Sequence, residues 1–504
     1  MKKILCLFAL ALVVVSCGNK NSESSYIPKD AVGVMYMNLG SLAEKSSNVD
    51  FKSLSVSKMI EQNAPQELKA FMDEYVNAEN MKSTFRNDFI LGFMTYERNS
   101  GSGGLIIPIN DAASFANMIT PMLDKIPGGA KKQENVGKGD AFTVYSSRDM
   151  AIGWNDKTAL VVVGDEYVDQ ELINLTKLES SENINATNYF KGFFDTSKDM
   201  GMHFTSTPLS ATLKPLAKTM LQVDMDVENN NLVYYGNFEE DRVYTKTQLK
   251  FNDDVKSLIG YDSWMSKEYD ANLLNMIPTN APVVMKMSID FKGLYKHIES
   301  LQDNKLLPET MRNQLKAGMG MADTQLNGML QMSTDDMLGI FGESMILGVT
   351  EGITVKDSIR TYNYEGPEFE VFDKKVPYFY GAYSIKDMEK FESLMGFAMM
   401  MQRPESKGKN YFKLSDDMFV LLKDNAIFVT NDEKGADEIF SNGKLAANLS
   451  DFKHKDKLAN TMYIYSSAEA GKMLSEVFNS MNPYARLYGG QDLGMKDTYE
   501  IMSE

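Results

Sequence analysis

The chain has little of the side-chain chemistry on which most metal proteins and many enzymes depend. Among its 504 residues there are only two cysteines and three histidines. Cys6 and Cys17 both lie near the N-terminus, so the body of the chain offers no disulfide, thiol nucleophile or thiolate metal site. His203, His297 and His454 are too far apart for the short histidine spacings of zinc sites. The sequence therefore predicts no bound metal and no cofactor.

The motifs of common catalytic sites are also missing. Residues 342–344 lack the second glycine of a nucleophile elbow, and residues 137–139 lack the upstream glycine of a P-loop. Residues 224–230 alternate acids as a calcium loop does, but Asn229 and Tyr235 stand where its glycine and glutamate belong. A Ser-His-Asp triad or a carboxylate pair assembled from distant segments would leave no motif. The sequence predicts that the protein is not an enzyme and identifies no catalytic residue.

Positive charge is in the minority. The 52 lysines and arginines face 69 aspartates and glutamates, which gives a net charge of −17 at pH 7. Such a surface repels the phosphate backbone, so no nucleic-acid partner is expected. The acids are spread along the chain, which is typical of a solvated surface.

The N-terminal residues have the pattern of an export signal. Lys2 and Lys3 precede an apolar run at residues 4–15, which is shorter than the roughly 20 residues of a membrane-spanning helix. A basic start followed by an apolar run of this length predicts a secretory signal. The run ends in Val-Val-Ser-Cys-Gly at residues 14–18, which resembles the lipobox of bacterial lipoproteins.

This resemblance implies a covalent lipid anchor. A diacylglyceryl thioether would form on Cys17, with cleavage between Ser16 and Cys17 and acylation of the new amine. Residues 1–16 would then be a lipoprotein signal peptide, and residues 17–25 the lipidated N-terminus and tether. The alternative is an ordinary signal peptide that contains a cysteine by chance.

The residues after the cysteine bear on location. Gly18, in place of an aspartate, favours the outer membrane in related export systems. The tether has one acid, Glu23, balanced by Lys20, rather than the acidic cluster of lipoproteins that reach the cell surface. The periplasmic face of the outer membrane is therefore slightly favoured over the cell surface.

The sequence contains an internal repeat. Six segments of the first half have counterparts in the same order in the second half: 27–31 with 277–281, 34–37 with 284–287, 90–93 with 346–349, 109–115 with 385–391, 159–166 with 426–433, and 202–206 with 462–466. Collinear matches of this kind predict that one fold is duplicated. We place the first repeat at residues 26–260 and the second at 270–504. Chance similarity between common patterns is the alternative.

Both repeats alternate predicted strands and helices. Period-2 apolar segments predict strands at 32–39, 89–96, 105–109, 142–145, 149–154 and 159–163, and again at 282–289, 345–350, 378–384, 411–414, 418–422 and 426–430. Helices are expected at 65–76 and 308–321, and after N-caps at Asn110 and Ser384. Strands in hairpins with segregated helices predict an α+β fold, with two tandem antiparallel sheets and flanking helices.

The repeats differ at their ends. The first continues with predicted strands at 221–227, 232–238 and 243–251. The second has a predicted helix at 468–481 and one short strand at 499–502. The second repeat is therefore expected to lack its last strands, as a degenerate or truncated copy would, and to leave a strand edge open near its C-terminus.

The lipobox, the Ile-Pro-x-Asp/Asn-Ala openings at residues 27–31 and 277–281, and the doubled pattern resemble one family of large bacterial lipoproteins. This family is known as domain of unknown function family 4836. The resemblance covers nearly all of the chain after the signal. It implies export, lipidation and a duplicated α+β fold, and it implies no activity and no catalytic residues.

Methionine is the one residue type in excess, with 36 copies. Methionine fills cores and also suits adaptable binding surfaces. Met400 and Met401 lie off the apolar face of their predicted helix, and Met319 and Met321 form a second cluster. These four are the candidate partner surface, although a core position is the default for the methionines as a group.

These features predict a cell-envelope lipoprotein that binds a partner without catalysis, in a cleft or interface formed by the duplication. The expected partners are the membrane that holds the lipid and an envelope protein, peptide or glycan. One alternative is an envelope hydrolase that acts on glycan or peptide. Another is an assembly factor for outer-membrane complexes.

Overall fold

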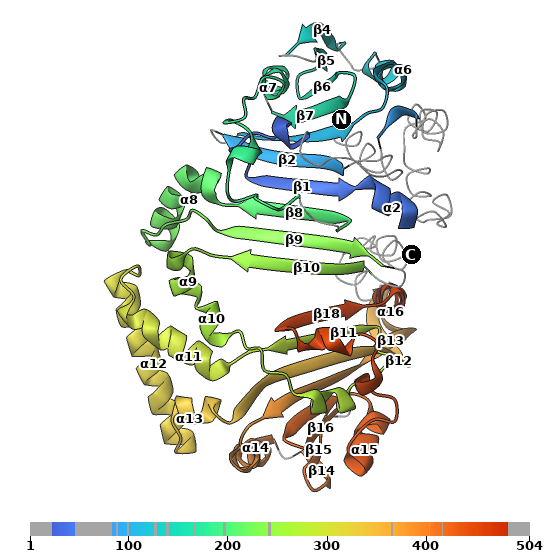
Figure 1. Ribbon diagram of the computed structural model, residues 1–504. Coiled ribbons are helices and arrows are strands. Elements are labelled where there is room, and N and C mark those ends of the chain that lie inside the picture. Colours follow the sequence, from blue (N-terminus) through green and yellow to red (C-terminus); the bar gives the residue numbers. More distant parts are fainter. Residues whose placement is uncertain are drawn as a thin grey trace. The chain divides into compact units, whose positions relative to one another are not determined.

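In the computed structural model the chain divides into two compact units, with the border between Val255 and Lys256. The structure describes residues 23–45, 83–86, 89–97, 100–124, 129–137, 141–165, 167–194, 198–239, 243–363, 366–402, 404–415 and 417–481. Each unit is an antiparallel sheet flanked by helices (Figure 1). The predicted α+β fold with two related domains is confirmed.

The first unit is built on a ten-stranded sheet with the order β10-β9-β8-β1-β2-β3-β7-β6-β5-β4. Its strands are β1 (Gly33–Asn38), β2 (Phe89–Glu97), β3 (Ser100–Pro108), β4 (Lys131–Val136), β5 (Phe142–Ser146), β6 (Met150–Trp154), β7 (Thr158–Gly164), β8 (Met200–Thr205), β9 (Asn231–Phe238) and β10 (Val243–Lys250). Its helical elements are η1 (Glu23–Tyr26), α2 (Leu39–Lys45), α6 (Ala112–Leu123), α7 (Val168–Leu175), η2 (Ile184–Ala186), η3 (Thr207–Leu209), α8 (Ser210–Leu216) and η4 (Ala217–Leu221), and α9 (Asp253–Ile259) contains the border.

Both faces of the first sheet carry an apolar core. On one face, Val34 and Leu91 belong to a buried cluster with Leu172 of α7. On the other face, Ile107 lies in a second cluster with Phe115 of α6. Successive strand residues point to opposite faces, so one sheet contributes side chains to both clusters. The first unit therefore has three layers, with the sheet in the middle.

The second unit has an eight-stranded sheet with the order β14-β15-β16-β17-β13-β12-β11-β18. Its strands are β11 (Val283–Ser288), β12 (Phe341–Asn363), β13 (Gly366–Ile385), β14 (Glu405–Gly408), β15 (Tyr411–Ser415), β16 (Met418–Lys423), β17 (Ala426–Thr430) and β18 (Met462–Ser466). Its helical elements are α10 (Tyr261–Trp264), η5 (Ala271–Met276), α11 (Phe291–Ser300), η6 (Leu301–Asp303), α12 (Glu309–Leu330), α13 (Thr334–Leu338), α14 (Met388–Gln402), α15 (Glu433–Asn442), η7 (Leu449–Asp451), η8 (Lys455–Ala459) and α16 (Ala468–Ser480).

The second sheet is covered in the same way as the first. Ile346 and Phe428 share a buried cluster with Ile439 of α15. On the opposite face, Ile385 lies in a smaller cluster with Phe391 of α14. Since α15 follows β17 as α7 follows β7, and α14 follows β13 as α6 follows β3, both units use the same connections.

The strand pairing of the two units shows which residues are equivalent. Val34 of β1 lies opposite Phe93 and His203, whereas Val284 of β11 lies opposite Gly348 and Tyr465. Main-chain contacts outside the sheets also repeat. The N–H of Ile184 donates to the carbonyl of Ile27, as that of Leu449 does to Ile277. The duplication therefore extends to individual hydrogen bonds.

Three of the six sequence matches are displaced from this equivalence. Leu91 and Ile346 are equivalent, because Leu91 pairs with Tyr36 and Ile346 pairs with Lys286. The sequence match instead aligns Leu91 with Leu347, one residue further along. Residues 159–166 are likewise displaced by one and residues 202–206 by two. A shift of one residue reverses the face of every side chain and a shift of two keeps it, so identical letters at neighbouring strand positions do not mark equivalent residues.

The helix caps lie one and three residues later than predicted. Asp111, not Asn110, caps α6, because its Oδ1 accepts from the N–H of Ser114 at 2.6 Å. In the second unit, Asp387 accepts from the N–H of Lys390 at 3.1 Å. Ser384 instead donates to the carbonyl of Ser344. Aspartate binds the free amide hydrogens of a first helical turn well, and both repeats use it at equivalent positions.

Replacing either cap by alanine should lower the urea midpoint of its own unit measurably, because one first-turn N–H loses its acceptor. Asp111→Ala and Asp387→Ala should therefore have similar effects in urea denaturation. Asp111→Ser and Asp387→Ser are the matched controls and should recover most of the loss. An alanine variant as stable as the natural protein would contradict the assigned caps.

The described part of the second unit has no counterpart of β9 and β10, as expected for a repeat without its last strands. The predicted strand at 221–227 is wrong, because η4 is a π-helical turn that ends at Leu221 and irregular chain follows. Strands β4 and β14 were not predicted. Strand β12 continues well beyond its predicted last residue, 350, and β13 begins well before its predicted first residue, 378. The helix at 65–76 and the strand at 499–502 lie outside the described residues.

Candidate functional site

The predicted site residues are only partly within the described chain. Ser16 and Cys17 precede it, and the side chains of Met400 and Met401 on α14 are also outside it. Met321 is 65% exposed on α12. Met319 on the same helix is half-buried, and its sulfur accepts from Gln302 at 3.1 Å. Met319 and Met321 thus lie on different faces of α12 and do not form one surface.

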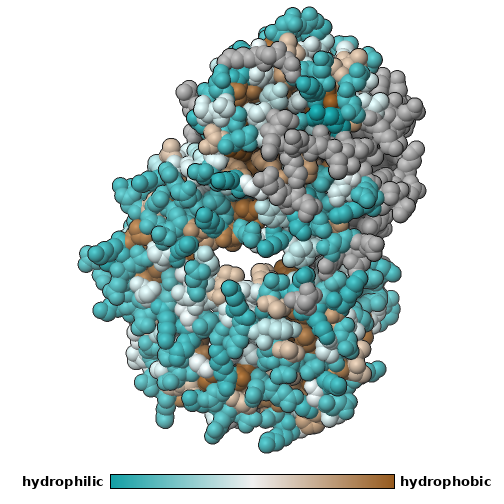
Figure 2. All heavy atoms as spheres, in the orientation of Figure 1, coloured by the Kyte–Doolittle hydropathy of each residue, from teal (hydrophilic) through white to brown (hydrophobic). Residues whose placement is uncertain are grey.

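The face of the molecule seen in Figure 2 is mainly hydrophilic, with hydrophobic residues in scattered groups. Within the described residues no helix is both long and apolar enough to cross a membrane. In the same residues, no three histidine, cysteine, aspartate or glutamate side chains are grouped so that they could hold a metal ion.

The three histidines pack against neighbours inside their own units. His203 contacts the rings of Phe190 and Phe193, and burial lowers the pKa of its imidazole. A nitrogen of His297 lies 3.0 Å from the carbonyl of Leu258, and His454 lies edge-on to an aromatic ring. Strand pairing makes Tyr465, rather than Tyr463, the counterpart of His203. An aromatic residue is thus kept at that position by packing.

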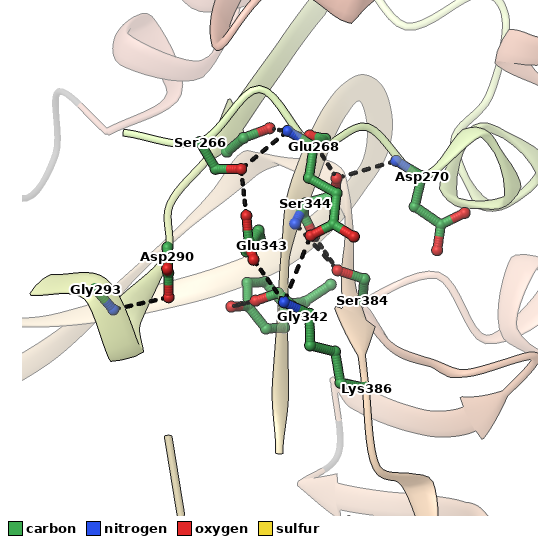
Figure 3. Close-up of polar contacts among 12 residues, drawn as sticks. Ser266, Glu268, Asp270, Asp290, Gly293, Gly342, Glu343, Ser344, Ser384 and Lys386 are labelled. Carbon is green, nitrogen blue, oxygen red and sulfur yellow. Dashed lines mark hydrogen bonds and ion pairs between the residues drawn. The ribbon is translucent and has the colours of Figure 1, made fainter. Parts of the chain in front are cut away.

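A row of buried polar residues crosses the second sheet. Ser288 of β11 lies opposite Ser344 of β12, whose N–H donates to the Ser384 hydroxyl of β13 at 3.0 Å. The hydroxyls of Ser288 and Ser344 donate to the carbonyl of Glu268 at 2.6 and 3.1 Å. Figure 3 shows Ser344 and Ser384 beside the segment that carries Glu268 and Asp270. The row therefore binds the main chain of the segment that leads into η5.

Lys286 extends this row. Its side chain is 1% exposed, and its ammonium donates to Ser288 at 2.5 Å and to the carbonyl of Asn460 at 2.7 Å. Burial lowers its pKa from 10.5 to about 8, because the charged form loses hydration. The nitrogen also lies 5.5 Å from the ring centre of Tyr269. Lys286 thus ties β11 to the segment before β18.

A carboxylate cluster lies at the end of the row (Figure 3). Glu343 accepts from the Ser266 hydroxyl and from Lys386, whose nitrogen lies 2.5 Å from Oε1. Burial raises the pKa of the Glu343 carboxyl, but the hydrogen bonds from Lys386 and Ser266 outweigh it and lower the pKa. Both carboxylate oxygens are occupied by protein groups. The cluster is suited to holding the connecting segment in place.

A second polar site, which we call the asparagine pocket, opens in the second unit. Its volume is about 620 Å³. It is lined by four carboxamides, two carboxylates, one lysine, three apolar side chains and a glycine: Asn272, Asn275, Asn410, Asn425, Glu392, Asp424, Lys423, Met276, Met388, Leu422 and Gly443. None of these residues was predicted from the sequence as part of a site.

Five separate segments form the asparagine pocket. Asn272 and Asn275 come from η5, and Glu392 from α14. Asp424 and Asn425 form the two-residue turn between β16 and β17, with φ values of +52° and +56°. A positive φ at both positions is the geometry of a tight hairpin turn, which Asp and Asn tolerate better than most residues. The turn therefore places a carboxylate and a carboxamide side by side at the pocket.

Hydrogen bonds fix two charged groups of the pocket. Asn410 donates from Nδ2 to Glu392 at 2.7 Å. Lys423 donates to the carbonyls of Ile439 and Phe440 at 3.0 and 2.8 Å, near the C-terminus of α15. A cation is favoured at that end of a helix. The lysine is thus held by the protein itself, while the carboxamides keep unused donors and acceptors.

The first unit lacks this group of side chains. The equivalence of Phe115 and Phe391 places Ala112 and Ala116 where α14 has Met388 and Glu392. At the equivalent turn, Asn155 uses its carbonyl oxygen to accept the N–H groups of Lys157 and Thr158. Polar residues present only in the second copy are the sequence signal that could have indicated the pocket.

Comparison with known proteins gives a family. The model of a family described as "Domain of unknown function (DUF4836)" matches residues 24–481. The chain belongs to this family. No curated protein matches this DUF4836 chain. The predicted family is therefore confirmed, and no activity comes with it.

Solved structures resemble the DUF4836 chain only weakly. Crystal form III of TP0453 is 12% identical, with a TM-score of 0.28, over 48% of this chain and 86% of that one. Crystal form I is 10% identical, with a TM-score of 0.26, over 48% and 85%. Values this low do not bear on function.

Proposed function

We propose that the protein is a cell-envelope lipoprotein that binds a small polar ligand without catalysis, tethered to the outer membrane through Cys17. The N-terminal pattern supports the tether, and the periplasmic face is favoured over the cell surface. The asparagine pocket supports the binding role, because convergent polar groups in a concave site are the usual basis of ligand recognition. This pocket is the observation that carries the proposal.

The anchor has a direct test. Cys17→Ala should abolish incorporation of labelled palmitate and move the protein from the membrane fraction to the extract, because no other acylation site follows the signal. The matched control is Cys6→Ala, which leaves the lipobox intact and should be labelled normally. A labelled, membrane-bound Cys17→Ala variant would overturn the anchor.

The binding role is tested by photo-crosslinking in the envelope. A photoreactive benzoylphenylalanine at exposed Asn425, at the mouth of the pocket, should capture a discrete adduct. The control position is Asn229, an exposed turn residue of the first unit that also has a positive φ. The same adducts from both positions, or none at 425, would count against the pocket as the binding site.

The second candidate is an envelope hydrolase that acts on glycan or peptide. It is favoured by the presence of Glu392 and Asp424 in one pocket, since glycoside hydrolysis uses a carboxylate pair. Release of reducing sugar by the natural protein, lost in Glu392→Gln, would support this candidate. Binding that persists without any product supports the non-catalytic role.

A further inference from the structure

We infer that the ligand of the asparagine pocket is a neutral sugar. This inference rests on the proposed binding role and names the ligand class. Three properties of the lining support it: the charge balance, the double hydrogen-bonding character of the carboxamides and the apolar floor. Each comes from the residues that surround the pocket.

The charge balance disfavours anions. Two carboxylates, Glu392 and Asp424, line the pocket against one lysine. Lys423 already donates to two main-chain carbonyls at the end of α15, so its charge is partly satisfied there. A phosphate or a peptide carboxylate would meet repulsion from both acids. The ligand is therefore neutral or cationic.

The carboxamides favour hydroxyl groups. Each asparagine side chain has an oxygen that accepts and an NH₂ that donates two hydrogen bonds. A sugar hydroxyl both donates and accepts, so a carboxamide can satisfy either role, whereas a carboxylate can only accept. Asn410 and Glu392 are already joined at 2.7 Å, and together they present a donor beside an acceptor. Adjacent hydroxyls of a sugar ring fit such a pair.

The floor of the pocket is apolar. Met276 is 1% exposed and Leu422 is 7% exposed, and Met388 of α14 is half-buried beside them. Met276 and Leu422 thus close the base of the pocket with little surface of their own, and the C–H face of a sugar ring can pack on Met388 while its hydroxyls reach the polar wall. A volume of about 620 Å³ is within the usual range for ligand sites and admits a short oligosaccharide.

A basic peptide is the competing ligand, since its positive charges could pair with the two carboxylates of the pocket. Its main-chain amides could pair with the carboxamides, but its charged side chains would depend on the two carboxylates, whereas a neutral sugar has no charge to place there. The affinities for the two ligands should therefore be affected by different substitutions in the pocket. Removal of a carboxamide should impair sugar binding, whereas neutralising a carboxylate should impair peptide binding most.

The test uses the full lipoprotein in lauryldimethylamine oxide micelles, because sugar-based detergents would compete. The probes are maltotriose, mannotriose and chitotriose, with trilysine amide as the cationic probe, followed by saturation-transfer NMR and titration calorimetry. We expect at least one trisaccharide to bind and to show transfer to its ring C–H protons. Asn410→Gly, which suits the φ of +62° at this position, should weaken that binding by about tenfold or more.

The control is Asn188→Ala, an exposed asparagine of the first unit, which should bind as the natural protein does. Thermal melting of each variant checks its folding. Binding of trilysine amide with no trisaccharide bound would overturn the sugar inference and leave the proposed binding role intact. No binding of any probe, with a specific adduct still captured at position 425, would also overturn the sugar alone. Failure of both experiments overturns both proposals.

Discussion

Asp199→Ala should lower the free energy of unfolding of the first unit by about 3 kcal/mol. The Asp199 side chain is fully buried, with 0% exposure. It accepts from the Ser41 hydroxyl at 2.5 Å, from Lys45 at 2.7 Å and from the N–H of Phe238 at 2.5 Å. Removal of the carboxylate leaves three donors from α2 and β9 without their acceptor. A donor left without its acceptor in a partly buried position is costly, and here three are affected together.

Two further variants divide this effect. Asp199→Asn keeps one acceptor oxygen but loses the charge, so its loss should be intermediate. Lys45→Ala leaves the fully buried Asp199 carboxylate with two neutral donors and no counter-charge, so its loss should also be intermediate. Urea denaturation in a Trp264→Phe background isolates the first unit, since Trp154 is then the only tryptophan. A loss below about 1 kcal/mol for Asp199→Ala would contradict the prediction.

The free energy of unfolding of the second unit should rise with pH relative to that of a Lys286→Met variant. The pKa of Lys286 is lowered from 10.5 to about 8 in the folded protein. Between these pH values the unfolded chain binds more protons than the folded one, so stability increases as pH rises. The free energy of unfolding should therefore rise by about 3 kcal/mol between pH 8 and pH 10.5. Below pH 7 Lys286 adds no pH dependence, because it is protonated in both the folded and the unfolded state.

The measurement is urea denaturation at several pH values, in a Trp154→Phe background so that Trp264 reports the second unit. Subtraction of the Lys286→Met curve removes the titration of tyrosines and other lysines. Lys423→Met is the control, since Lys423 is only half-buried. A difference between natural protein and Lys286→Met that is constant from pH 7 to pH 10.5 would show that Lys286 is not the titrating group.

The duplication could be predicted from the sequence because apolar strand patterns survive in both copies. Its register could not, because identical letters at neighbouring positions belong to opposite faces of the sheet. Gly92 and Gly348 illustrate this: a methyl group on Gly92 would meet Met35, whereas one on Gly348 would meet Ile277, in a different layer. Only cross-strand partners decide which residues correspond.

The asparagine pocket could not be predicted, because its residues come from five segments spread between positions 272 and 443. Asn272 and Gly443 meet only after the sheet and helix α15 are assembled. The caps show a smaller limit of the same kind. Asn110 and Asp111 are both good capping residues, and the end of β3 decides between them, since Asn110 donates to the carbonyl of Phe85.

The polar row of the second sheet has a consequence for how the chain assembles. Where the second unit has Lys286, Ser344 and Ser384, the first has Tyr36, Phe89 and Pro108. The two repeats share the order of their equivalent strands, so a strand of one repeat could pair in the sheet of the other while the chain is being synthesised. A strand in the wrong copy would bury an ammonium against aromatic rings or leave serines without partners. The divergence at this row should thus make mispaired intermediates costly and favour pairing of each copy with its own strands.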